Sequence, residues 1–169
     1  SPFVSSGSIA EAQVTLPPGA YHWQVRATAT GFQSAYVSFG ANPESSSDFM
    51  IDLAEPNSTV STAGPIGPGY GGSILGTASD ATSGVQAVEV RIQRTSDGLF
   101  WDGAAFQAAP AFVATTLTGG NWSYAFGPVE GESYAVSSRA TDLAGIVETT
   151  LGSATFLFDT IAPASSPTT

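Results

Sequence analysis

The sequence predicts an all-β protein built on an antiparallel β-sandwich, and three observations carry that prediction. Glycine and proline together supply 30 of the 169 residues, whereas charged residues make up only 11%, a composition typical of short strands and turns. Several short segments alternate apolar and polar residues between clusters of Gly, Pro or Asp, as half-buried strands do. The chain also repeats itself. With 42% apolar residues it can bury a core.

The internal repeat fixes the expected domain organisation. FMIDLAEPNS (49–58) recurs as FLFDTIAPAS (156–165), at an offset of 107 residues, and YHWQVRAT (21–28) recurs as YAVSSRAT (134–141), at an offset of 113. A period near 107 matches the roughly 100 residues of an immunoglobulin-like sandwich. We therefore expect a tandem array, with the incomplete C-terminal part of one repeat at 1–52, a complete repeat at 53–160, and a linker into a following repeat at 161–169.

Strand signals follow one another through the complete repeat. Residues 73–79 form a short apolar run, and in 85–95 Val88, Val90 and Ile92 share one face of an alternating strand. Asp97-Gly98 is a strong hairpin signal and turns the chain into residues 99–101. Further strands are expected at 112–117, 122–126, 134–140 and 149–158. About seven short strands is the count of an immunoglobulin-like sandwich.

Specific motifs also resemble a known family. GTASD (76–80), SGV (83–85), VEV (88–90) and RATDLAG (139–145) resemble the Ig-like repeats of large bacterial surface proteins. LPPGAY (16–21), followed by WQVR (23–26), resembles the end of a fibronectin type III or related module. The resemblance implies an extracellular or cell-surface location, neighbouring repeats in the same chain, and a tyrosine corner in which Tyr21 bonds back to upstream backbone.

Composition argues against several functions. The net charge of −10 would repel a nucleic acid backbone, and no apolar run approaches the roughly 20 residues needed to insert in a membrane. The chain has no cysteine and a single histidine, His22, so a hydrolytic triad or a zinc site lacks its usual residues. We therefore expect no enzyme activity.

Acidic residues point to calcium as a candidate ligand. In an immunoglobulin-like sandwich, the linker acids Asp52 and Glu55 belong at the same pole as Asp80, in the 78–84 loop, and Asp142, in the 141–145 loop. Four carboxylates at the junction between repeats would repel one another unless a cation bound there. The alternative interpretation is that Asp80 and Asp142 only bond local backbone amides as Asx turns.

Adjacent aromatic residues offer a second candidate site. Phe100 and Trp101 are neighbours on one strand, so their side chains face opposite ways and both cannot enter the core. One of them could stack on a surface glycan, or the loop at 102–111 could cover it.

These observations predict a structural repeat segment, a stalk, adhesin or filament spacer, of an extracellular multidomain protein. The alternative is a carbohydrate-binding or adhesive module that uses Phe100 or Trp101, and a third interpretation is an accessory domain of a secreted hydrolase. Residues 1–52 supply too few strands for a sandwich, so we expect them to be completed either by further chain or by another subunit.

Overall fold

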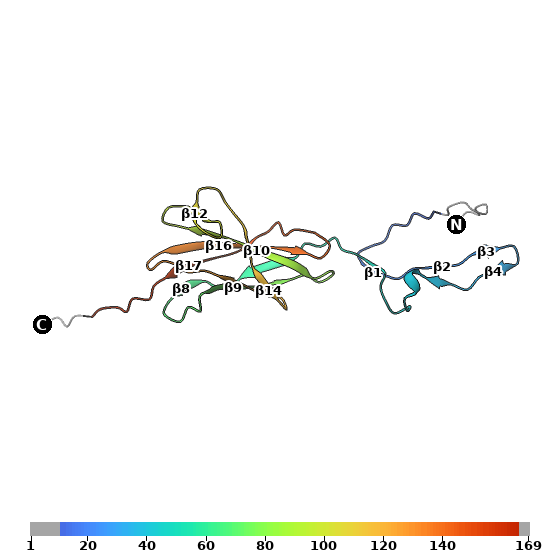
Figure 1. Cartoon of the computed structure of the whole chain (residues 1–169), viewed down its shortest axis with the longest axis horizontal. Helices are drawn as coiled ribbons and strands as arrows, with labels where there is room; N and C mark the ends of the chain where they lie inside the picture. The colour runs from blue at the N-terminus through green and yellow to red at the C-terminus, as the bar shows by residue number, and fades with distance from the viewer. Residues whose placement is uncertain (1–10, 166–169) are drawn as a thin grey trace. The chain divides into compact units, whose positions relative to one another are not determined.

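The computed structural model describes residues 11–165, and the chain divides into two compact units, Ser1–Leu53 and Ala54–Thr169. Each unit is described by itself below (Figure 1). The protein is all-β, as the sequence predicts, and none of the helices in the described residues is long and apolar enough to cross a membrane.

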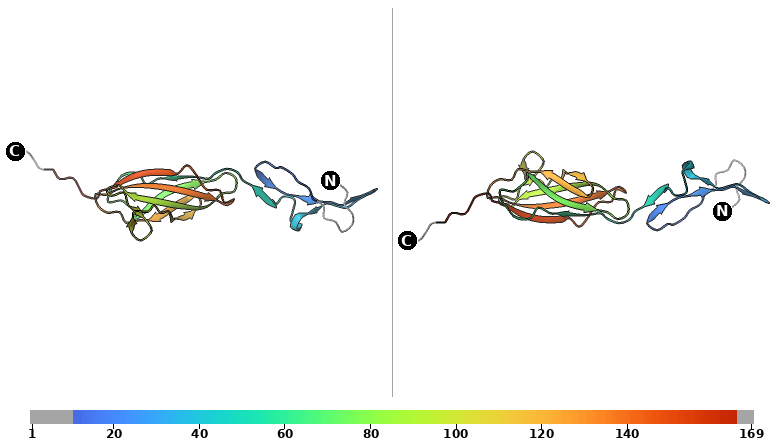
Figure 2. Two further views of the ribbon diagram at one scale, coloured as in Figure 1. Left: turned by 90° about the horizontal axis from the view of Figure 1, so that it is seen from above. Right: turned by 90° about the horizontal axis from the view of Figure 1, so that it is seen from below.

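The second unit is a β-sandwich of two sheets, antiparallel except for the parallel pairing of 156–158 with 64–66 at the edge of the larger sheet, and its strands run roughly along one direction in both views of Figure 2. The larger sheet has the order β12-β11-β10-β16-β17-β8, with β13 also paired to β10, and the smaller has the order β14-β15-β9-β7. The strands are β7 (Asn57–Val60), β8 (Gly64–Ile66), β9 (Ser73–Ser79), β10 (Val85–Arg94), β11 (Phe100–Trp101), β12 (Phe106–Gln107), β13 (Val113–Ala114), β14 (Thr116–Thr118), β15 (Asn121–Ala125), β16 (Ser133–Asp142) and β17 (Gly152–Phe158).

Alternation along the strands builds the core. In β10 the predicted face of Val88, Val90 and Ile92 is buried, and in β16 every second residue from Tyr134 onward is buried. The other buried apolar residues of the core are Ile74, Ala78, Trp122, Phe126 and Phe156. Trp122 approaches the β9 backbone so closely that a Cβ at Gly76 would lie 2.2 Å from its ring and 2.0 Å from the Thr59 carbonyl oxygen. Only glycine fits at that position.

The structure corrects two strand predictions. Residues 112–117 were expected to form one strand, but β13 pairs with β10 in the larger sheet and β14 pairs with β15 in the smaller one. The chain changes sheets at Thr115, whose amide and hydroxyl both donate to the Val88 carbonyl oxygen. The strand expected from residue 149 begins at Gly152. The preceding residues form a loop in which Val147 bridges Thr141.

The first unit is a two-stranded antiparallel ribbon. Its elements are β1 (Gly19–Tyr21), β2 (Gln24–Val25), β3 (Thr28–Ala29), β4 (Phe32–Gln33), β5 (Val37–Ser38), the 3-10 turn η1 (Phe39–Ala41) and β6 (Phe49–Ile51). β1 pairs with β6, β2 with β5, and β3 with β4 at the turn (Figure 1). No residue from 11 to 51 is buried. The tyrosine corner is confirmed, because the Tyr21 hydroxyl donates to the Pro17 carbonyl oxygen at 2.6 Å.

The two units share a strand register. In the first, Tyr21 lies opposite Phe49 across β1 and β6, and in the second Tyr134 lies opposite Phe156 across β16 and β17. These are the residues that the internal repeat aligns. The tyrosine hydroxyl is used in both, since Tyr134 accepts a hydrogen bond from the amide of Val129 at 3.0 Å.

Candidate metal centre

Asp142 occupies the last inward-facing position of β16. The alternation that buries Tyr134 and Val136 continues to this residue, so its side chain is fully buried (0% exposed) at the end of the apolar row. Its Oδ1 accepts a hydrogen bond from the amide of Ile146 at 2.7 Å, whereas its buried Oδ2 has no hydrogen-bond partner. A buried carboxylate oxygen without a donor is costly, and a bound cation is one way to satisfy it.

Asp80 directly follows β9 and folds the next loop around itself. Its Oδ1 accepts hydrogen bonds from the amides of Thr82, Ser83 and Gly84 at 2.8 to 2.9 Å. Gly84 closes this turn with a φ of 87°, a conformation that favours glycine. The local backbone hydrogen bonds of the alternative interpretation are therefore present at both acids, as an Asx turn at Asp80 and as a bond from the amide four residues on at Asp142, and at both residues they are made to Oδ1.

Three of the four predicted acids come together. Asp52, in the segment that joins β6 to β7, is 9% exposed, and one carboxylate oxygen from each of Asp52, Asp80 and Asp142 lies within 4.8 Å of the others. These three residues are called the acid cluster below. Three atoms so close together all lie within about 2.8 Å of a common point, near the 2.3–2.6 Å of calcium–oxygen bonds.

Glu55 does not belong to the acid cluster, contrary to the prediction of four convergent acids. Its Oε2 accepts hydrogen bonds from the Thr149 amide at 2.9 Å and the Thr149 hydroxyl at 2.7 Å. These bonds, the hydroxyl first, lower the pKa of the Glu55 carboxyl. Glu55 therefore fastens the start of the second unit to the loop before β17.

The donor set of the acid cluster suits a hard cation. It consists of carboxylate oxygens, which calcium and magnesium prefer, and it offers no nitrogen or sulfur for zinc. Calcium takes six to eight oxygens, so three carboxylates would leave room for water or carbonyl ligands.

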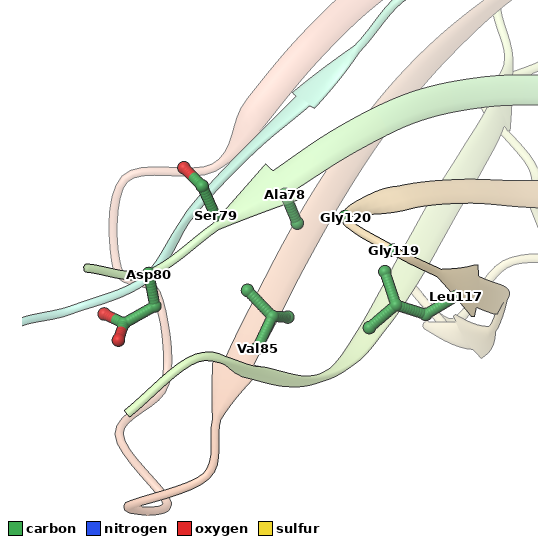
Figure 3. A pocket seen from close by; sticks show the side chains of 7 residues that line it. All are labelled: Ala78, Ser79, Asp80, Val85, Leu117, Gly119 and Gly120. Carbon is green, nitrogen blue, oxygen red and sulfur yellow. The ribbon is translucent and has the colours of Figure 1, made fainter. Parts of the chain in front are cut away.

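A cavity of about 460 Å³ lies beside Asp80 (Figure 3). Its other lining residues include Ala78, Val85, Leu117 and Gly120. Figure 3 shows the Asp80 carboxylate turned away from the side chains of Val85 and Leu117.

The aromatic candidates Phe100 and Trp101 face opposite ways, as the sequence predicts. Trp101 packs on the core, with its ring 5.3 Å from that of Phe106 and its Nε1 donating to the Tyr124 hydroxyl at 2.8 Å. Phe100 lies on the outer face of the larger sheet, near the guanidinium of Arg91. Trp101 is therefore held by the core, and Phe100 is the member of the pair that faces outward.

Glu148 is a buried acid that the sequence analysis did not single out. It is 3% exposed, and it accepts hydrogen bonds from the Ser58 amide at 2.8 Å, the Ser58 hydroxyl at 2.6 Å and the Ala140 amide at 2.9 Å. Ser58 also shares a hydrogen bond with Ser138 at 2.7 Å. This carboxylate joins β7 to β16 across the sandwich, and no local pattern marks it.

Comparison with known proteins yields a structural likeness alone. No family model matches the chain, and no curated protein matches it. Among solved structures, the crystal structure of CopC from Methylosinus trichosporium OB3b is similar, with 12% sequence identity and a TM-score of 0.42. The alignment covers 64% of this chain and 100% of that chain.

Proposed function

We propose that this chain is a structural segment of an extracellular array of Ig-like repeats, without catalytic activity, in which the acid cluster binds calcium. Two observations on Asp142 carry the calcium site: its buried Oδ2 lacks a hydrogen-bond donor, and one of its carboxylate oxygens lies within 4.8 Å of an oxygen of each of two further acids. A cation would compensate this buried charge.

The repeat organisation rests on the shared register. Tyr21 and Phe49 pair as Tyr134 and Phe156 do, and both tyrosine hydroxyls bond to backbone a few residues upstream. This correspondence supports the first unit as the last hairpin of a sandwich like the second. Neighbouring repeats would then be its main partners, and a stalk, adhesin or filament spacer is the role that such an array serves.

Calcium would act on the segment between the repeats. Asp52 lies in the chain that enters the second unit, whereas Asp80 and Asp142 lie in two of its loops. An ion shared by the three would tie that segment to the loops and restrict its movement. Prolines 56 and 163 fix their own φ angles and would limit swivel at the two ends of the complete repeat.

Thermal unfolding with EDTA and with 10 mM calcium tests the site. For a dissociation constant of roughly 0.1 to 1 mM, as in extracellular modules, calcium would stabilise the second unit by about 1.4 to 2.7 kcal/mol, which is a shift of several degrees. The Asp80→Asn/Asp142→Asn variant should lose the shift. Asp102→Asn is a matched control, because Asp102 also accepts two backbone amides but is not part of the acid cluster.

The stability of Asp142→Asn in EDTA, compared with that of the wild type, distinguishes a cation site from ordinary turns. Without calcium, Asp142→Asn should be at least as stable as the wild type, because the amide removes one of three mutually repelling charges and supplies a donor. Chymotrypsin cleavage after the exposed Leu53 should also slow in calcium. If calcium changes neither the unfolding temperature nor the rate of cleavage, the calcium site is refuted and Asp80 and Asp142 are turn residues only.

A further inference from the structure

The outer face of the larger sheet carries two phenyl rings and two guanidinium groups in alternation. The Arg91 guanidinium carbon lies 5.9 Å from the centre of the Phe100 ring and 5.3 Å from that of Phe112, and the Arg139 guanidinium carbon lies 4.2 Å from the Phe112 centre. We call these four residues the arginine ladder. Each distance is within the range of a cation–π contact.

Strand pairing explains the arrangement. Arg91 lies opposite Ser137, and Arg139 lies opposite Glu89 across β10 and β16, so the two arginines are diagonal neighbours on one face. The pairing of Val90 with Val113 brings Phe112 alongside Arg91.

The two arginines of the arginine ladder differ in whether they have an ionic partner. Arg139 pairs with Glu89 at 2.7 Å, whereas Arg91 makes no ion pair with any residue from 11 to 165. Its hydrogen bond, from Nη2 to the Ser137 hydroxyl, is long at 3.4 Å. A guanidinium held against aromatic rings keeps its in-plane N–H groups available, and that edge matches a carboxylate with two parallel hydrogen bonds.

We propose that Arg91 anchors a binding site for the carboxylate of a sugar acid within an otherwise uncharged glycan. Its guanidinium binds the carboxylate edge-on, and the half-buried Phe100 and Phe112 offer apolar surface to the carbon atoms of the sugar. The net charge of −10 repels dense polyanions, so a single carboxylate on a neutral carrier fits this surface better than a sulfated chain. This site does not depend on the acid cluster.

Titration of the 15N-labelled chain with methyl glucuronide tests the proposal, with methyl glucoside and acetate as separate arms. We expect saturable shifts at Arg91 and its neighbours with millimolar affinity for the glucuronide, and binding of both other compounds at least tenfold weaker. Absence of a saturable shift with the glucuronide would overturn the proposal. Acetate binding as tightly as the glucuronide would overturn the sugar contact.

Two substitutions assign the effect to the guanidinium. Arg91→Gln should weaken glucuronide binding at least tenfold, and Arg91→Lys should also weaken it, because an ammonium cannot form the paired hydrogen bonds. Arg94→Gln is the matched control, since Arg94 is already paired with Asp97, and it should bind as the wild type does. Unfolding midpoints of all three variants establish that they are folded. Wild-type affinity in folded Arg91→Gln would refute the assignment.

Discussion

Replacement of the buried Glu148 should cost the second unit more stability than any other change to a single acidic side chain. Glu148→Ala removes the acceptor for two amides and one hydroxyl, all buried between β7 and β16. An unsatisfied buried donor costs about 1 to 3 kcal/mol, and water that enters the vacated space recovers part of it. Three donors therefore predict a loss of about 3 to 5 kcal/mol.

Thermal and urea unfolding followed by tryptophan fluorescence measure this loss, because Trp122 lies in the same sandwich core. A loss of that size corresponds to a decrease in Tm of roughly 12 to 20 °C for a domain of about 100 residues. Glu132→Ala is the matched control, since the Glu132 carboxylate accepts an exposed hydrogen bond from Ser96, and it should change stability by less than about 0.5 kcal/mol. A Glu148→Ala variant within about 1 kcal/mol of the wild type would refute the reasoning.

Three further predictions concern packing and pH. Gly76→Ala should destabilise the second unit by about 3 kcal/mol or more in the same unfolding assay, because the new Cβ meets a backbone oxygen that cannot rotate away. Gly71→Ala is the control and should be nearly neutral, since a Cβ at Gly71 has nothing within 4 Å. Burial raises the pKa of Tyr70 to about 12, so the phenolate absorbance of Tyr70 should appear above the ordinary pH of about 10 and be missing from the titration of Tyr70→Phe. The contribution of the neutral Tyr70 side chain to stability should be lost as pH rises above 10. The hydrogen bond from Arg94 lowers the pKa of Asp97, so this carboxylate stabilises the fold above its ordinary pKa of 3.8 and loses that effect as pH falls further. The free energy of unfolding of Asp97→Asn should therefore fall less steeply at acid pH than that of the wild type.

Local patterns were sufficient to predict the main strands and the faces they bury. Alternation in β10 identified Val88, Val90 and Ile92 as core residues, and the position of Asp142 after the corresponding row in β16 accounts for its burial. The change of sheets at Thr115 was not predictable, because it depends on a bond to the Val88 carbonyl 27 residues away, and the residues 112–117 have no glycine or proline to mark a break.

The candidate site was also predictable from the sequence only in part. Asp80 and Asp142 lie close together, as the sequence predicts, because Asp80 follows β9 and Asp142 ends β16 at the same pole of the sandwich. The partner of Glu55 is Thr149, 94 residues later, and that of Glu148 is Ser58, 90 residues earlier. Contacts at such separations depend on the assembled fold, and a single sequence carries no local signal for them.

The parallel pairing of β8 with β17 has a mechanical consequence. Phe156, Leu157 and Phe158 lie opposite Gly64, Pro65 and Ile66 with both strands pointing the same way. Tension applied through the two ends of the second unit pulls these strands in opposite directions along their length. The paired residues are then loaded together in shear and cannot unzip one at a time. This short parallel pairing therefore resists extension of the second unit through all of its hydrogen bonds at the same time.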